Sequence, residues 1–213
     1  MSSPDFKDAL RRSRVIAIVR GDFEVAQYLT IAQVLFEAGI PAVELTIEKP
    51  NALEAIARLS REGPDDLWIG AGTVRTGESA RKALEVGARY LISPGFVRDV
   101  AEVALAASVP YLPGVLTPSE VETAVAAGLR TVKLFPAKPL GPAYLEALKA
   151  PLADVEFVPT GGIQPADARQ FIEAGALAVG LGSSLTGVNA DRVEIEERAG
   201  RLLESLRSGA ASA

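Results

Sequence analysis

Short apolar runs recur along the chain at intervals of roughly 20 to 27 residues, and a stretch with helical periodicity follows each of them. The eight runs cover residues 15–20, 42–46, 67–70, 89–92, 110–112, 131–135, 156–159 and 178–182. Repeated strand–helix units are typical of an α/β fold with a parallel sheet. Eight units in 213 residues fit a minimal (β/α)8 barrel. We therefore predict a single-domain TIM barrel over residues 1–207.

Glycine and proline mark the ends of the predicted helices. Four glycines stand where a helix should end in a left-handed turn: Gly39, Gly87, Gly128 and Gly175. Pro118 and Pro165 stand at the first position of two helices. A short N-terminal helix is expected over residues 4–13 and a closing helix over about 190–207. The low-complexity residues 208–213 are predicted to be a disordered tail.

A doubly wound open sheet is the alternative fold. Such a sheet usually carries a glycine-rich nucleotide loop after its first strand. Residues 20–23, Arg-Gly-Asp-Phe, do not form that motif. The barrel is therefore favoured.

Composition removes several classes of function. The formal net charge of −5 disfavours nucleic-acid binding, which needs clustered lysine and arginine. The charged N-terminal residues and the lack of long apolar runs predict a cytoplasmic protein without membrane partners. The chain contains no cysteine and no histidine, so thiolate nucleophiles, histidine triads and the usual zinc ligands are excluded. We expect no metal and no cofactor, and acid–base chemistry from carboxylate, lysine, tyrosine or water.

Lys133 stands inside an apolar run, whereas the other lysines fall in apparent helices or loops. Alternation in a strand sends Val132 and Leu134 to one face and Lys133 to the other. If the apolar pair meets the helices, the amine points into the barrel, where poor solvation favours the neutral form that attacks a ketone. The alternative is a buried structural ion pair.

Glu44 interrupts the run 42–46 with the same parity, so a carboxylate and an amine should face one cavity. A base beside the nucleophile could move the protons that imine formation and carbon–carbon cleavage require. Alternatively, Glu44 only neutralises Lys133.

Small residues follow the last two predicted strands, in Thr160-Gly161-Gly162 and Gly182-Ser183-Ser184. Barrels often hold phosphate between these two loops, because backbone N–H groups can approach it closely there. Tight turns are the alternative explanation for each loop. Arg20 ends the first run and could hold a substrate carboxylate, or be a solvated rim arginine. Thr73 could contact the substrate.

Six segments together resemble, in order, motifs of the 2-keto-3-deoxy-6-phosphogluconate (KDPG) aldolase family. They are Val43-Glu44-Leu45-Thr46, Ile69-Gly70-Ala71-Gly72-Thr73-Val74, Ile92-Ser93-Pro94-Gly95, Leu112-Pro113-Gly114-Val115, Val132-Lys133-Leu134-Phe135-Pro136-Ala137 and Val158-Pro159-Thr160-Gly161-Gly162-Ile163. The resemblance implies a homotrimeric, metal-free class I aldolase of the Entner-Doudoroff pathway that splits KDPG reversibly into pyruvate and glyceraldehyde 3-phosphate. Its partners would be a small 2-keto acid and an aldehyde phosphate.

By position, Lys133 matches the Schiff-base lysine of the family, Glu44 the acid/base glutamate, and Thr73 a threonine near the substrate. Pocket-lining positions are matched by Pro94, Pro113 and Phe135. The phosphate site is matched by Thr160, Gly161, Gly162 and Ser183.

One departure concerns the carboxylate anchor. Many relatives carry an arginine soon after the glutamate motif, where this chain has Glu48. Some relatives end the first strand in an arginine instead, and residues 17–20 resemble that version, which assigns the anchor to Arg20. Related aldolases act on 2-keto-3-deoxy-6-phosphogalactonate or 4-hydroxy-2-oxoglutarate, so these substrates stay open. The same barrel could also serve a phosphosugar epimerase or decarboxylase, or bind phosphate without catalysis.

Overall fold

The computed structural model describes residues 5–187 and 191–208. The strands of this part are β1 (Val15–Val19), β2 (Ala42–Thr46), β3 (Trp68–Gly72), β4 (Tyr90–Ile92), β5 (Tyr111–Leu112), β6 (Gly114–Val115), β7 (Thr131–Leu134), β8 (Glu156–Pro159) and β9 (Val179–Leu181). The helices are α1 (Phe6–Ser13), α2 (Val25–Glu37), α3 (Pro50–Glu62), α4 (Gly77–Glu85), α5 (Arg98–Ala106), α6 (Pro118–Ala126), α7 (Gly141–Lys149), α8 (Pro165–Glu173), α9 (Ser183–Thr186) and α10 (Arg192–Ser208).

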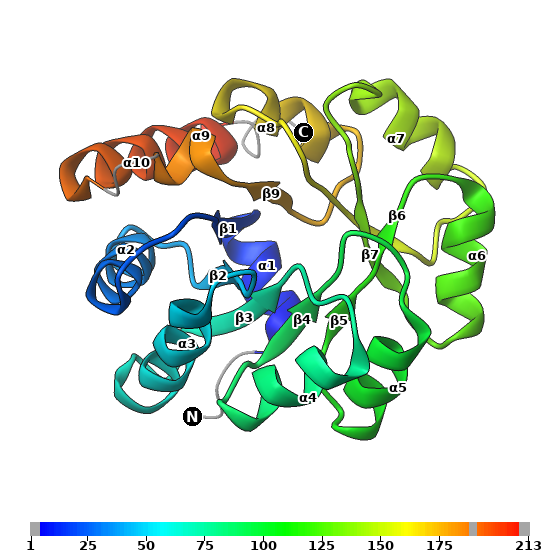
Figure 1. Cartoon of the computed structure of the whole chain (residues 1–213). Helices are drawn as coiled ribbons and strands as arrows, with labels where there is room; N and C mark the ends of the chain where they lie inside the picture. Colours follow the sequence, from blue (N-terminus) through cyan, green and yellow to red (C-terminus); the bar gives the residue numbers. More distant parts are fainter. Residues whose placement is uncertain (1–4, 188–190, 209–213) are drawn as a thin grey trace.

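The strands form a closed barrel of parallel pairs, with the helices arranged around it (Figure 1). One run of pairing follows the order β5-β4-β3-β2-β1-β9 and the other the order β6-β7-β8. Strands β5 and β6 flank Pro113 and act as two halves of one barrel strand. A bridge between Thr160 and Gly180 joins the β8 end to β9. The predicted TIM barrel is confirmed.

Some strand boundaries differ from the prediction. The sequence predicts one strand over 110–112, but pairing switches from β4 to β7 at Pro113, which has no N–H to donate. Strand β3 continues to Gly72 because that residue pairs with Thr46. Arg20 and Phe135 lie just beyond their strands, at the rim.

The ends of the chain also differ slightly from expectation. The closing helix α10 runs from Arg192 to Ser208, so Ser208 is helical and does not begin the tail. The rest of the predicted tail, 209–213, lies outside the described residues, as does the first residue of the predicted N-terminal helix.

The predicted helix boundaries agree with the structure at the marked positions. The four glycines named for left-handed turns all have φ between 84 and 99°. Helix α6 begins at Pro118, where the side chains of Thr117 and Glu120 form a capping box. Helix α8 begins at Pro165.

Alternation along the strands separates two apolar layers. Residues such as Val43, Leu45, Val132 and Leu134 point outward and pack with the helices in the larger cluster. The inward residues form a smaller cluster inside the barrel: Phe6, Leu10, Ile16, Ile18, Ala42, Tyr90, Ile92, Leu112, Val158, Leu177 and Ala178. The parity predicted for Lys133 and Glu44 is therefore confirmed, since their strand neighbours belong to the outer layer.

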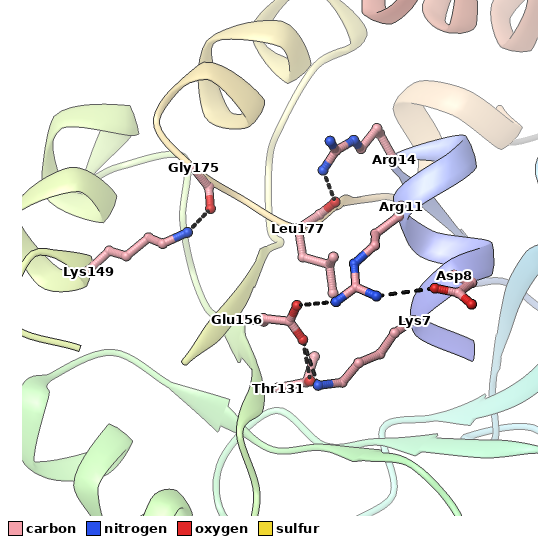
Figure 2. A network of polar contacts seen from close by, with 9 residues as sticks. All are labelled: Lys7, Asp8, Arg11, Arg14, Thr131, Lys149, Glu156, Gly175 and Leu177. Atoms are coloured by element: carbon pink, nitrogen blue, oxygen red, sulfur yellow. Dashed lines mark hydrogen bonds and ion pairs between the residues drawn. The ribbon is translucent and has the colours of Figure 1, made fainter. Parts of the chain in front are cut away.

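Helix α1 closes the N-terminal end of the barrel. Phe6 enters the inner cluster and stacks on Tyr90, with ring centroids 4.6 Å apart, and it contacts Trp68 in a tilted arrangement at 5.2 Å. Figure 2 shows Lys7 and Arg11 both reaching Glu156 of β8, at 2.7 and 3.0 Å. With this end blocked, the opposite end, at the carboxyl ends of the strands, is where a barrel builds its site.

Candidate active site

Lys133 is held rigidly in the middle of β7. Strand β7 pairs with β6 on one side and β8 on the other, and the Lys133 N–H donates to the Pro113 carbonyl at 2.9 Å. The side chain is buried, with 6% of the residue exposed, and its Nζ lies 5.0 Å from the centre of the Phe135 ring. Within residues 5–187 and 191–208, no carboxylate lies within ion-pair distance of this amine. The structural ion pair considered from the sequence is thus not formed.

Glu44 lies on the inner face of β2 and is 1% exposed. Its carboxylate covers Gly72 so closely that a Cβ there would overlap it. Burial raises the pKa of Glu44, and the positive charges of Lys133 and Arg20 oppose that shift. The Oε2 atom has no hydrogen-bond partner among the described residues. The group is therefore poised to exchange a proton.

A cavity of about 390 Å³ opens at the carboxyl ends of the strands and brings most of the predicted residues together. Its wall contains Ile18, Arg20, Glu44, Lys133, Phe135, Thr160, Gly161, Gly162, Ile163, Gln164, Gly180, Gly182, Ser183 and Ser184. The amine and the carboxylate come from β7 and β2, across the barrel from each other. A volume of this size suits a small organic substrate.

The two glycine-containing loops form one side of this cavity. Gly161 and Gly162 have φ of 98 and 77°, a conformation that favours glycine. The Ser184 hydroxyl donates to the Ile163 carbonyl at 3.0 Å and so ties the segment after β9 to the loop after β8. Helix α8 begins at Pro165, soon after the first loop, and the predicted second loop is helical from Ser183, where α9 begins. The free N–H groups of both helix starts therefore lie at this side of the cavity. The arrangement suits a small anion.

Arg20 also lines the cavity, at the end of β1 next to β9, and is held by two neighbours. Its Nη2 donates to the Thr73 hydroxyl at 3.0 Å, and its Nε lies 3.8 Å from Glu48. Thr73 has a φ of 58°, which is strained for a β-branched residue. Such strain is often retained at functional sites.

Three predicted residues do not line the cavity wall. Pro94 is exposed beyond the end of β4. Pro113 is buried between β5 and β6, where its carbonyl holds the backbone of Lys133. Thr73 also lies outside the wall and reaches it through Arg20.

The wall contains residues that the sequence motifs do not single out. Ile18 and Gly180 lie two positions before Arg20 and Gly182, so strand alternation could have found them. Gln164 caps α8, and Ser184 belongs to the loop motif after the last strand, although the sequence assigns neither residue to the site. In the described part of the chain, no group of three His, Cys, Asp or Glu side chains could hold a metal ion. No described helix has the length and apolar character needed to cross a membrane.

The closed barrel and this cavity place the protein among the TIM-barrel enzymes. Residues 6–199 match the family model described as KDPG and KHG aldolase. The chain is 40% identical over 166 residues to the 2-dehydro-3-deoxy-phosphogluconate aldolase of Treponema pallidum, covering 78% of each chain. It is 40% identical over 154 residues to the enzyme of that name from Pseudomonas aeruginosa, covering 72% of this chain and 69% of the relative.

Solved structures agree with this match. A crystal structure described as a 4-hydroxy-2-oxoglutarate and 2-dehydro-3-deoxyphosphogluconate aldolase superposes with a TM-score of 0.85 at 39% identity, over 95% of this chain and 99% of that one. KDPG aldolase from Legionella pneumophila, solved with pyruvate captured as a covalent carbinolamine, gives a TM-score of 0.77 at 29% identity, over 95% and 96% of the two chains. The protein belongs to the KDPG and KHG aldolase family.

Proposed function

We propose that this protein is a metal-independent class I aldolase that reversibly cleaves KDPG to pyruvate and glyceraldehyde 3-phosphate. Lys133 is the Schiff-base nucleophile and Glu44 is the acid/base group. The observation that carries the proposal is the shared cavity: a buried amine without an ion-pair partner in the described part of the chain faces a buried carboxylate. The carbinolamine named for the Legionella pneumophila relative is the intermediate expected from such an amine.

The reaction begins with attack of the neutral Lys133 amine on the C2 ketone. The carbinolamine loses its hydroxyl as water after protonation, and a protonated imine forms. The C3–C4 bond then breaks, its electron pair moves into the imine to give an enamine, and the C4 hydroxyl proton passes to Glu44. Glyceraldehyde 3-phosphate leaves. Protonation of the enamine at C3 and hydrolysis of the imine release pyruvate and restore Lys133.

Substrate binding uses the remaining residues around the cavity. Arg20 binds the carboxylate, because a guanidinium can donate two parallel hydrogen bonds to it. Thr73 acts through Arg20, whose guanidinium donates to its hydroxyl. Phe135 lines the pocket, and Pro113 acts indirectly, because its carbonyl holds the backbone of Lys133. The phosphate is bound by backbone and hydroxyl donors of the two loops: Thr160, Gly161, Gly162, Gly182 and Ser183.

The substrate is assigned to KDPG on the strength of the relatives. The two relatives at 40% identity carry the phosphogluconate aldolase name. The Escherichia coli 2-dehydro-3-deoxy-6-phosphogalactonate aldolase is 33% identical over 80% of this chain. A pyruvate-release assay should therefore give the highest kcat/KM with the phosphogluconate, then the phosphogalactonate, then unphosphorylated 4-hydroxy-2-oxoglutarate. Equal rates with and without phosphate would contradict the phosphate-binding loops.

The Schiff base is tested by trapping. Borohydride added with pyruvate should attach one reduced pyruvate to the wild-type protein, and Lys133→Ala should abolish the adduct. Lys138→Ala is the matched control and should keep it, since Lys138 is an exposed lysine that pairs with Asp167. An adduct mapped to a lysine other than Lys133 would overturn the assignment.

We also propose a homotrimer in the cytoplasm, on the basis of the family resemblance. Light scattering coupled to gel filtration should give three times the chain mass of 22.3 kDa. Cell fractionation should recover the protein with cytoplasmic markers.

A further inference from the structure

Glu44 and Tyr90 belong to one row across the barrel wall. Glu44 of β2 pairs with Gly70 of β3, and Gly70 pairs with Tyr90 of β4. Residues in one row of neighbouring strands point to the same face of the sheet. The carboxylate and the phenol therefore both point into the barrel, with a residue that has no side chain between them.

Glycines on β3 make the room that this row needs. A Cβ on Gly70 would overlap the ring of Tyr90, and a Cβ on Gly72 would overlap the Glu44 carboxylate. The two side chains thus lie over successive inward positions of the same strand. Phe6 of α1 stacks on the Tyr90 ring and restricts its position.

Both groups are buried polar atoms that need a partner. Tyr90 is 0% exposed and Glu44 is 1% exposed. In the part of the chain that the structure describes, the Tyr90 hydroxyl and Glu44 Oε2 have no hydrogen-bond partner. Buried polar atoms without partners are costly, so each of them calls for an explanation, and a role in catalysis is one. Tyr90 does not line the cavity, so it has no access to substrate and would act only through Glu44.

We propose that Tyr90 is a positioning residue whose hydroxyl donates a hydrogen bond to the Glu44 carboxylate whenever that carboxylate is ionised. The proposal rests on the function proposed above, in which Glu44 must be ionised to accept the C4 hydroxyl proton. A neutral donor stabilises the ionised form of a buried carboxylate without adding charge. When Glu44 takes up the proton, the hydrogen bond weakens and the proton can be passed on.

Several groups face Glu44 from the surrounding strands. Lys133 approaches from β7 and Arg20 from the end of β1, and both charges act against the effect of burial. Strand β3 presents only glycine at this level, and β4 presents Tyr90. Burial, and then the negative charge of Glu44, raise the pKa of the Tyr90 phenol well above its ordinary value, so the phenol keeps the proton that it donates.

Tyr90→Phe tests the inference because it removes the hydroxyl and keeps the ring. We expect the acidic limb of the kcat/KM profile for cleavage to move to higher pH by about one unit. KM should change less than about twofold, and kcat should return to the wild-type value above the shifted limb. Site-specific 3-fluorotyrosine at position 90 keeps the hydroxyl as a stronger donor, so it should move the limb to lower pH.

Tyr111→Phe is the matched control. It removes a hydroxyl from the neighbouring strand β5, where Tyr111 points outward and contacts the loop residues Gly95 and Val97. The acidic limb of the kcat/KM profile of Tyr111→Phe should coincide with that of the wild type. A uniform loss of kcat in Tyr90→Phe with an unmoved limb would mean that Tyr90 only fills space, and would overturn the inference.

Pyruvate trapping by borohydride separates this inference from the proposed function. If the wild type and Tyr90→Phe both form the Lys133 adduct and the limbs coincide, only the role of Tyr90 is overturned. If the wild type forms no adduct, the proposed function is overturned, and the inference with it. If both proteins form the adduct and the acidic limb of Tyr90→Phe is displaced to higher pH, the proposed function and the role of Tyr90 are both supported. If Tyr90→Phe does not fold, the protein with 3-fluorotyrosine at position 90 decides the role of Tyr90. A shift of its acidic limb to lower pH supports the inference, and an unchanged limb overturns it.

Discussion

The Nε atom of Arg20 lies 3.8 Å from a carboxylate oxygen of Glu48, at the rim of the cavity. Both side chains are at least half exposed, so the pair is weak, yet it competes for the guanidinium that is proposed to bind the substrate carboxylate. Glu48 thus lies where it can tune affinity without touching the reacting atoms.

Removing the charge of Glu48 should release Arg20. We expect Glu48→Gln to lower KM for the 2-keto acid by about two- to fivefold, because exposed ion pairs contribute up to about 1 kcal/mol. Steady-state kinetics on wild type and variant measure this. Glu62→Gln, which breaks the exposed pair with Arg58 on α3, is the control and should leave KM unchanged. A higher KM in Glu48→Gln would mean that Glu48 holds Arg20 in its binding position.

Glu44→Gln should separate activity from stability. The loss of the proposed acid/base group should lower kcat by about 100- to 10,000-fold. Because burial raises the pKa of folded Glu44, the folded protein binds this proton more tightly than the unfolded chain does. The stability that this proton contributes is complete below the pKa that Glu44 has in the unfolded chain. It is lost as the pH rises through the higher pKa that Glu44 has in the folded protein.

We therefore expect Glu44→Gln to have a higher free energy of unfolding than the wild type at pH 8, and no such advantage at pH 4. Urea denaturation at both pH values measures the difference. Glu62 is exposed, and a hydrogen bond from Arg58 lowers its pKa, so Glu62→Gln should show no gain at pH 8. An equal gain at both pH values for Glu44→Gln would point to packing and not to ionisation.

Gly70→Ala should destabilise the barrel interior. The added methyl group would overlap the Tyr90 ring, which is buried and already stacked on Phe6, so the core must expand. Overpacking of this kind costs about 1 to 3 kcal/mol. Thermal or urea unfolding provides the measurement. Gly200→Ala, in the exposed middle of α10 with open space around it, should instead be neutral or stabilising by up to about 1 kcal/mol.

Glu156→Gln should loosen helix α1 in a pH-dependent way. Burial would raise the pKa of Glu156, but hydrogen bonds from Lys7 and Arg11 outweigh it, so the pKa lies below its usual value (Figure 2). Because its pKa is lowered, ionised Glu156 stabilises the folded protein at pH values above the pKa that it has in the unfolded chain. That contribution disappears as the pH falls through the lower pKa of the folded protein. Unfolding at pH 7 should therefore show a less stable variant, and unfolding near pH 3 should not. A constant difference at all pH values would contradict the ion pairs as its source.

The sequence by itself determined the barrel and the inward direction of two polar residues. Alternation of apolar and polar positions is a local property of each strand, so it fixed the inward direction of Lys133 and Glu44. Glycine and proline fixed the helix ends for the same reason, since a turn conformation depends on neighbouring residues alone.

Only the tertiary structure decided which inward residues meet. The row Glu44–Gly70–Tyr90 depends on the register of three strands, which separations along the chain do not encode. The contact of Arg20 with Thr73 and Glu48 joins the ends of three units, and the split of the fifth strand at Pro113 follows from pairing with two different partners. Register and rim contacts arise when the ring of strands closes, and closure is a property of the whole chain.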